Sequence, residues 1–265
     1  PRAARGLEAH GLAAPLVGRD EELRQLLGAF DRMLGASAQV VSLIGEAGSG
    51  KSRLVRELLG KLAERGDLAT TTVRQAACTS LGERTYGVLG TFLQQAYGVG
   101  PADTLETARA KVVAGLQSVG GTEDEVAAVA PLVGHLLGLE AGRAQPGDVE
   151  PEQLRRRIFL ATRTLFERRL ERGPLLLVVE DLQWADSASL ELLRFVVDRL
   201  ADRKLMLVAT HRPGFDAAAL GGGRVSHTSC RLALLSAAQS ETILRGFFGA
   251  DLDRWPATLR NVVVA

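Results

Sequence analysis

Short apolar runs alternate along the chain with longer stretches in which apolar residues recur every three or four positions. Uninterrupted apolar runs of four to eight residues are typical of strands that are covered on both faces of a sheet. Three such runs, at residues 40–44, 175–179 and 205–209, are the strong strand candidates. The less apolar segments at 70–73 and 231–234 are weaker candidates. The helical spacing predicts helices at 20–34, 53–65, 187–200 and 236–248, with Asp20 and Ser236 as N-caps and Gly35 and Gly66 as stops. Five strands that alternate with helices predict an α/β fold with a parallel sheet and helices on both faces.

The same pattern divides the chain into a leading linker and one domain. Residues 1–16 are rich in Ala, Gly and Arg without sustained periodicity, and we expect a linker there. Residues 17–265 are expected to form the domain. Between about 79 and 174 the spacing is mostly helical and interrupted by Gly and Pro, which predicts a helical insertion between the second and third strands. Its last helix, at about 152–172, carries many arginines, which we interpret as a solvent-facing side rather than as a site for an acidic partner.

The composition argues against direct nucleic-acid binding and against a membrane protein. The chain has 265 residues, 46% of them hydrophobic, which is enough for one large core. Its 32 basic and 31 acidic residues leave a net charge of +1, so direct binding of nucleic acid by this fragment is not expected. Cys78 and Cys230 are far apart and are read as ordinary thiols of a reducing compartment. Without a long apolar run or a signal peptide, we expect a cytoplasmic protein that makes no use of a membrane. The start without Met and the end in mid-pattern indicate a piece of a longer protein.

A glycine-rich segment between the first apolar run and the next helix carries the strongest chemical signal. Residues 45–52 read Gly-Glu-Ala-Gly-Ser-Gly-Lys-Ser and fit the phosphate-binding pattern G-x-x-x-x-G-K-[S/T]. Glycines let the backbone wrap a polyphosphate closely, and the following helix presents its N-terminal amides to it. We expect Lys51 to reach the β- and γ-phosphates and the Ser52 hydroxyl to be a ligand of Mg²⁺. The predicted nucleotide-binding residues here are Gly45, Glu46, Ala47, Gly48, Ser49, Gly50, Lys51, Ser52 and Arg53.

Two adjacent acids, Glu180 and Asp181, follow the buried run 175–179 directly. Ligands of open α/β sheets gather beyond the carboxyl ends of the strands, so we expect these acids to coordinate Mg²⁺ and to polarise the attacking water. Chain order favours Glu180 for the metal and Asp181 for the water, but neighbouring strand residues point to opposite faces, and the reverse division stays open. Thr210 and Arg212 end the next run and are candidates to sense hydrolysis, Arg212 by its charge. The catalytic candidates are Lys51, Glu180, Asp181 and Arg212, and the metal candidates are Ser52, Glu180 and Asp181.

Four blocks of sequence together resemble one family. Residues 15–23, 45–53, 175–186 and 209–213 resemble the signal-transduction ATPases with numerous domains. The likeness is to the AAA-type, origin-recognition-like ATPase module that follows the cyclase domain in bacterial adenylate/guanylate cyclases and occurs in large helix-turn-helix regulators. Relatives often have Asp where this chain has Glu180. The fold class expected from the motif and the resemblance is a P-loop NTPase whose five-stranded parallel sheet has the order 5-1-4-3-2.

The resemblance also implies positions and ligands. Val17 and Arg19 would lie near the adenine, Lys51 and Ser52 at the phosphates and metal, Glu180 and Asp181 at the two acidic positions, and Arg212 at the sensor. ATP and Mg²⁺ are the implied cofactors, although the phosphate loop by itself does not distinguish ATP from GTP. The implied partners are ATP or ADP, attached effector and sensor domains outside the fragment, and further copies of the chain under nucleotide control.

We therefore interpret the chain as a slowly hydrolysing regulatory ATPase module of a larger signalling protein. Three alternatives stay open from the residues. A DNA-acting motor or loader of the origin-recognition kind would need a basic face or an attached DNA-binding domain. A small-molecule kinase would need an acceptor pocket and a closing segment, for which the insertion is a candidate. A module that binds nucleotide without turnover would act only as a scaffold.

Overall fold

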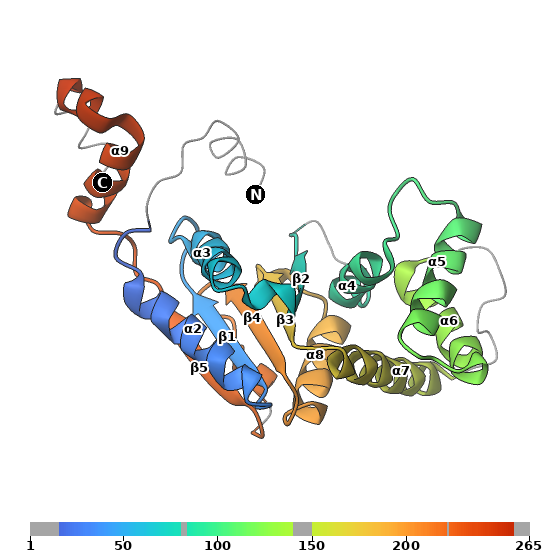
Figure 1. Cartoon of the computed structure of the whole chain (residues 1–265). Coiled ribbons are helices and arrows are strands. Elements are labelled where there is room, and N and C mark those ends of the chain that lie inside the picture. The colour runs from blue at the N-terminus through green and yellow to red at the C-terminus, as the bar shows by residue number, and fades with distance from the viewer. Residues whose placement is uncertain (1–15, 81–83, 140–149, 222, 257–265) are drawn as a thin grey trace.

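The computed structural model describes residues 16–80, 84–139, 150–221 and 223–256 (Figure 1). Nearly all of the predicted linker 1–16 lies outside these ranges. The predicted boundaries of the domain and of its insertion stay predictions.

A five-stranded sheet forms the centre of the molecule, and all its neighbouring strands are parallel. Its order is β2-β3-β4-β1-β5, which confirms the predicted order 5-1-4-3-2 and the P-loop NTPase fold. The strands are β1 (Gln39–Ile44), β2 (Thr72–Ala77), β3 (Leu175–Glu180), β4 (Leu205–His211) and β5 (Ser226–Arg231). The register pairs Ile44 with His211 and Ala77 with Glu180, so the carboxyl ends of these strands reach one edge of the sheet.

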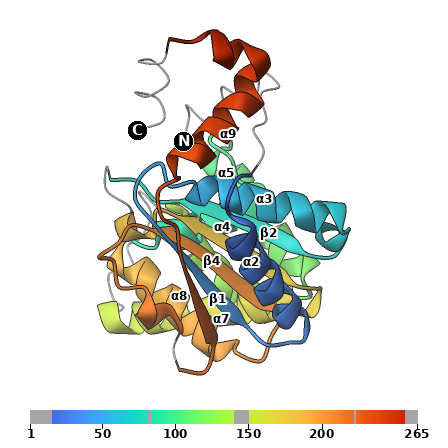
Figure 2. The same ribbon diagram turned by 90° about the vertical axis from the view of Figure 1, so that its left-hand side faces the viewer.

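Helices cover both faces of this sheet, and each face has its own core (Figures 1 and 2). On one face α2 (Asp20–Leu34) and α3 (Lys51–Glu64) pack on side chains such as Val41 and Val208. The other face is covered by α4, α7 and α8, which pack on the alternate residues of the strands. These helices are α4 (Gly87–Tyr97), α7 (Pro151–Glu171) and α8 (Ser187–Arg199). The central strands β1, β3 and β4 are buried on both sides, which explains why most of their residues are apolar.

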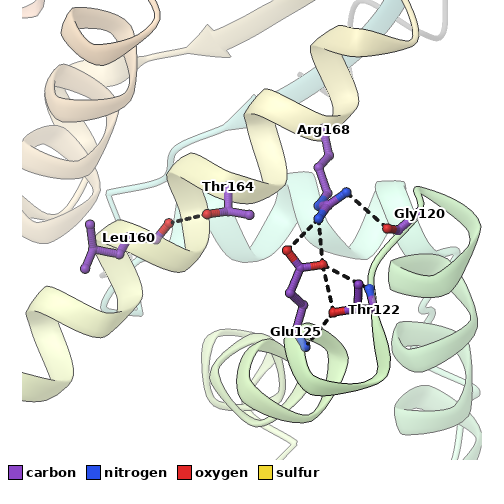
Figure 3. A network of polar contacts seen from close by, with 6 residues as sticks. All are labelled: Gly120, Thr122, Glu125, Leu160, Thr164 and Arg168. Carbon is purple, nitrogen blue, oxygen red and sulfur yellow. Dashed lines mark hydrogen bonds and ion pairs between the residues drawn. The ribbon is translucent and has the colours of Figure 1, made fainter.

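Four helices lie between β2 and β3 along the chain in the described ranges. Two of them, α5 (Leu105–Ser118) and α6 (Glu123–Leu137), stand farther from the sheet and pack on each other (Figure 1). Arg168 of α7 fixes them by donating to both carboxylate oxygens of Glu125, at 2.5 and 2.6 Å, and to the carbonyl of Gly120 (Figure 3). Glu125 in turn completes a capping box with Thr122 at the start of α6.

The last described helix, α9 (Ala237–Phe248), projects from the body beyond the end of β5 (Figures 1 and 2). Ser236 caps it through the Gln239 amide, as predicted, and none of its residues is buried. A short 3-10 segment, η4 (Gly249–Arg254), follows. Others are η1 (Asp67–Ala69), η2 (Leu182–Trp184) and η3 (Ala218–Gly221). Within the described ranges, no helix combines the length and apolar character that crossing a membrane requires.

Three sequence-based positions were wrong. Helix α2 begins at Asp20 with Arg19 in the N-cap position, so Asp20 acts in the first turn, where its charge favours the positive end of the helix dipole. The strand expected at 70–73 begins at Thr72. The fifth strand was expected at 231–234, but β5 ends at Arg231. It is an edge strand with one buried residue, Cys230, and mostly polar residues, so the apolar-run criterion missed it.

Candidate functional site

The loop between β1 and α3 has the backbone that its glycines predict. Gly48 and Gly50 adopt φ values of 82° and 91°, in the left-handed region that favours glycine. Gly45 is needed for a different reason, since a Cβ atom there would lie 2.4 Å from the Ser49 hydroxyl oxygen. The loop therefore turns sharply, and α3 begins at Lys51 with its free N-terminal amides facing the loop.

Lys51 folds back over this loop. Its Nζ donates to the carbonyl of Gly45 at 2.7 Å and to that of Glu46 at 2.9 Å, and the side chain is buried. Burial lowers the pKa of the Lys51 ammonium group, and the positive charge of Arg212 lowers it further. Asp181 and Glu46 act in the opposite direction and raise the pKa. Lys51 therefore shares one electrostatic environment with Asp181, Arg212 and Glu46.

The two acids at the end of β3 lie differently. The Ser52 hydroxyl donates a hydrogen bond to the Glu180 carboxylate, which brings a side chain of the first turn of α3 to the end of β3. Asp181 has left the strand and adopts a left-handed backbone with φ 56°. Its N–H donates to the Thr210 hydroxyl at 3.0 Å.

Gln183 connects the ends of β3 and β4. Its amide nitrogen donates to the Asp181 carboxylate at 3.3 Å, and its amide oxygen accepts from the backbone N–H of Arg212 at 3.3 Å. The predicted acid and the predicted sensor are thus joined through a side chain that the motifs did not single out. The only indication of this role in the sequence is that Gln183 lies two residues after Asp181.

Arg19 is buried against the backbone of the loop rather than exposed beside it. Its guanidinium donates to the carbonyl of Ser49 at 3.2 Å and to that of Ala233, and it pairs with Glu22 at 3.1 Å. This residue therefore joins α2, the phosphate loop and the segment after β5. Val17 is half-buried at the entry to the domain. The expected position of both residues near an adenine stays a prediction.

His211 lies at the end of β4, next to this group. Its ring is buried, Nδ1 lies 2.9 Å from the carbonyl oxygen of Arg212, and Nε2 has no hydrogen-bond partner within the described part of the chain. Burial lowers the His211 pKa, and the charges of Lys51 and Arg231 lower it further. The neutral imidazole is therefore favoured, as fits a residue that ends a buried strand.

Comparison of the chain with known proteins identifies its family. A model described as the AAA ATPase domain matches residues 15–208. The chain belongs to this family. An uncharacterized protein of Rhizobium meliloti (strain 1021) is 32% identical over 206 residues, which are 77% of this chain and 19% of that protein. The AAA ATPase domain described here thus spans about a fifth of the length of that relative.

Two solved structures are similar at low identity. The ORC1 protein of Aeropyrum pernix, in complex with DNA, has a TM-score of 0.47 and 16% identity, with coverage of 88% of this chain and 50% of that chain. The HORMA:CdnC:Trip13 complex of E. coli MS115-1 has a TM-score of 0.49 and 13% identity, with coverage of 94% and 73%. The family assignment rests on the match to the AAA ATPase domain model.

The AAA ATPase domain offers a donor set that suits Mg²⁺. A hydroxyl and a carboxylate, from Ser52 and Glu180, already meet, and both are hard oxygen ligands. The described residues contain no group of three or more His, Cys, Asp and Glu side chains that could hold a metal by themselves.

Asp186 is a further residue whose full role the motifs missed. It caps α8 by accepting from the Ser189 N–H at 2.8 Å, and it also accepts from the N–H groups of Tyr86 and Gly87 at 3.0 and 3.2 Å. One carboxylate thus satisfies the free amides at the start of two helices, α8 and α4. The start of α4 is thereby fixed to the element that follows the two acids.

Proposed function

We propose that this AAA ATPase domain binds ATP with Mg²⁺ between the phosphate loop and the ends of β3 and β4, hydrolyses it slowly, and passes its nucleotide state to other parts of a larger signalling protein. The observation that carries the proposal is the contact between Ser52 and Glu180. It joins the residue type that binds a metal in a phosphate loop to the acid at the end of the neighbouring strand.

Each side chain has a distinct task in this proposal. The loop amides and the N-terminus of α3 bind the phosphates, and Lys51 exchanges its two carbonyl partners for phosphate oxygens. Ser52 and Glu180 would hold Mg²⁺, and the ion would supply positive charge that neutralises the phosphates. Asp181 accepts a hydrogen bond from the attacking water and orients it, and Arg212 stabilises negative charge that develops on the γ-phosphate.

Slow turnover and regulation are the finer part of the proposal. Glu180 is one methylene longer than the Asp that is common in the family it resembles, which places the carboxylate differently relative to the metal. Gln183 joins Asp181 to Arg212, so loss of the γ-phosphate would change the ends of β3 and β4 together. The output would reach effector domains of a cyclase or a transcription regulator, and nucleotide-dependent self-association is part of the same proposal.

Product analysis with the purified chain tests this function. With Mg²⁺ and radiolabelled ATP we expect free phosphate to be released, and Asp181→Asn to abolish release while ATP still binds. Asp124→Asn, on the exposed part of α6, is the matched control and should leave the rate unchanged. Label transferred to an acceptor would instead identify a kinase. Equal release by the wild type and Asp181→Asn would leave only a nucleotide-binding scaffold.

A further inference from the structure

A cavity lies outside the proposed nucleotide site, on the face of the sheet opposite α3 and beside the edge strand β2. Its floor is formed by Leu175 and Leu177 of β3 and by their register partners Thr72 and Arg74 of β2. Helices α4, α5 and α7 supply the walls, with aromatic side chains from Phe92, Tyr97 and Phe166. The lining is thus largely apolar, and its volume is about 130 Å³.

Two guanidinium groups interrupt this apolar lining. Arg74 comes from the floor and Arg169 from α7, and both side chains are half-buried. Arg74 donates to the carbonyl of Val73 at 3.0 Å, and within the described ranges neither arginine has a carboxylate at ion-pair distance. The pKa of Arg169 is lowered by burial and then by the positive charges of Arg74 and Arg172. Cations that repel one another beside an apolar wall favour the binding of an anion.

The neighbouring arginines of α7 do not share this environment. Arg168 is fully engaged with Glu125 and Gly120 (Figure 3), and Arg172 donates to the carbonyl of Ser118 at the end of α5. These two contacts fix α7 to the α5–α6 hairpin on either side of Arg169. The wall that carries Arg169 is therefore held in place by its neighbours.

Gly115 shapes the cavity from α5. A Cβ atom there would lie 2.2 Å from Cδ1 of Tyr97, so the ring of Tyr97 rests directly on the helix backbone. Burial raises the pKa of the Tyr97 hydroxyl to about 12, which keeps it protonated and able to donate. Its hydroxyl has no hydrogen-bond partner within the part of the chain that the structure describes.

We infer that this cavity binds a small aromatic carboxylic acid of a single ring, with the ring among Phe92, Tyr97 and Phe166 and the carboxylate on Arg169 and Arg74. The size supports one ring, because an apolar cavity of roughly 150 Å³ binds benzene. Guanidinium groups bind a carboxylate through two parallel hydrogen bonds, which fixes the orientation of the acid. The site would place a ligand against the strand that ends in Glu180, while making no contact with the phosphate loop.

Calorimetric titration of the whole chain with benzoate tests the inference. We expect saturable binding, and we expect benzamide, which has the same shape without the charge, to bind about tenfold more weakly. Acetate, which carries the charge without the ring, should be weaker by at least as much. Equal binding of benzoate and benzamide would overturn the assignment of the carboxylate to the arginines, and no saturation by benzoate at millimolar concentration would overturn the site.

Variants place the binding in the cavity. Arg169→Gln should weaken benzoate about tenfold, whereas Arg157→Gln, an exposed arginine of the same helix, should leave it unchanged. Ala96→Leu fills the cavity from the exposed side of α4 and should also weaken binding without touching either arginine. Retained binding in both Arg169→Gln and Ala96→Leu would contradict the proposal. Lys51→Ala should bind benzoate normally, so this test is independent of the nucleotide site.

Discussion

Ser52 and Glu180 are separated by 128 positions in the sequence, yet the Ser52 hydroxyl donates a hydrogen bond to the Glu180 carboxylate. The contact joins the first turn of α3 to the last residue of β3. It depends on the sheet order, because β4 lies between β3 and β1 and the loop after β1 must reach across its end. The proposed metal site is therefore a consequence of the fold rather than of local sequence.

Glu180→Gln should weaken the use of Mg²⁺ more than the binding of ATP. The amide keeps the shape but is a poorer metal ligand than a carboxylate. We expect a clearly higher Mg²⁺ concentration for half-maximal phosphate release, and little change in ATP affinity measured without the metal. Glu106→Gln, an exposed glutamate of α5, is the control. An unchanged Mg²⁺ requirement would remove Glu180 from the metal site.

Gln183→Leu should slow phosphate release while nucleotide still binds. The substitution removes both the donor to Asp181 and the acceptor for the Arg212 N–H, at nearly constant volume. Loss of a positioned polar group of this kind costs about tenfold or more in rate. The comparison is with Gln94→Leu on the exposed side of α4. Normal turnover by Gln183→Leu would show that Asp181 and Arg212 act without this bridge.

Arg19→Gln should destabilise the domain. The buried guanidinium holds two backbone carbonyls and Glu22, and loss of charge-assisted hydrogen bonds in such a position costs about 1.5–3 kcal/mol. The free energy of unfolding in urea measures this cost. Arg24→Gln removes an exposed charge about 1.4 turns farther along the chain and should change stability little. If both variants unfold alike, Arg19 does not hold the loop.

Acid should destabilise the fold through two histidines. The pKa values of His211 and His227 are lowered mainly by burial, so the unfolded chain takes up protons before the folded one as pH falls through 6.5. The two neutral histidines therefore contribute fully to the free energy of unfolding above pH 6.5. This contribution is lost progressively as the pH falls from 6.5 to the lower pKa values of the folded protein. Urea titrations at pH 7 and 5.5 measure the loss. His211→Gln should reduce it, and His135→Gln, an exposed histidine of α6, should not.

The central part of the fold could be predicted because it is the part that is buried on both faces. The runs that became β1, β3 and β4 lie in the middle of the sheet, where most positions are buried and apolar. The edge strands β2 and β5 face solvent on one side, and their polar composition placed the predicted strands wrongly. Register is a property of the whole sheet and cannot be read from one such strand.

The candidate site divides in the same way. The phosphate loop was predictable because its sharp turn requires backbone angles that glycine adopts most readily. The acids were predictable because they follow a buried strand. The bridge through Gln183, the buried position of Arg19 and the second task of Asp186 depend on residues far away in the sequence. Arg169 shows the same limit, because it lies in a run of arginines that reads as a solvent-facing side, yet it lines a cavity.

Binding of labelled ATP to the wild type and to Lys51→Ala tests the central claim most directly. Lys61→Ala is the control, because Lys61 lies on the same helix and its ion pair with Glu64 is exposed. We predict that Lys51→Ala weakens ATP binding by at least about tenfold, since it removes a charge from the phosphates, and that Lys61→Ala binds as the wild type does. Equal affinity of all three proteins for ATP would contradict the assignment of the phosphate loop.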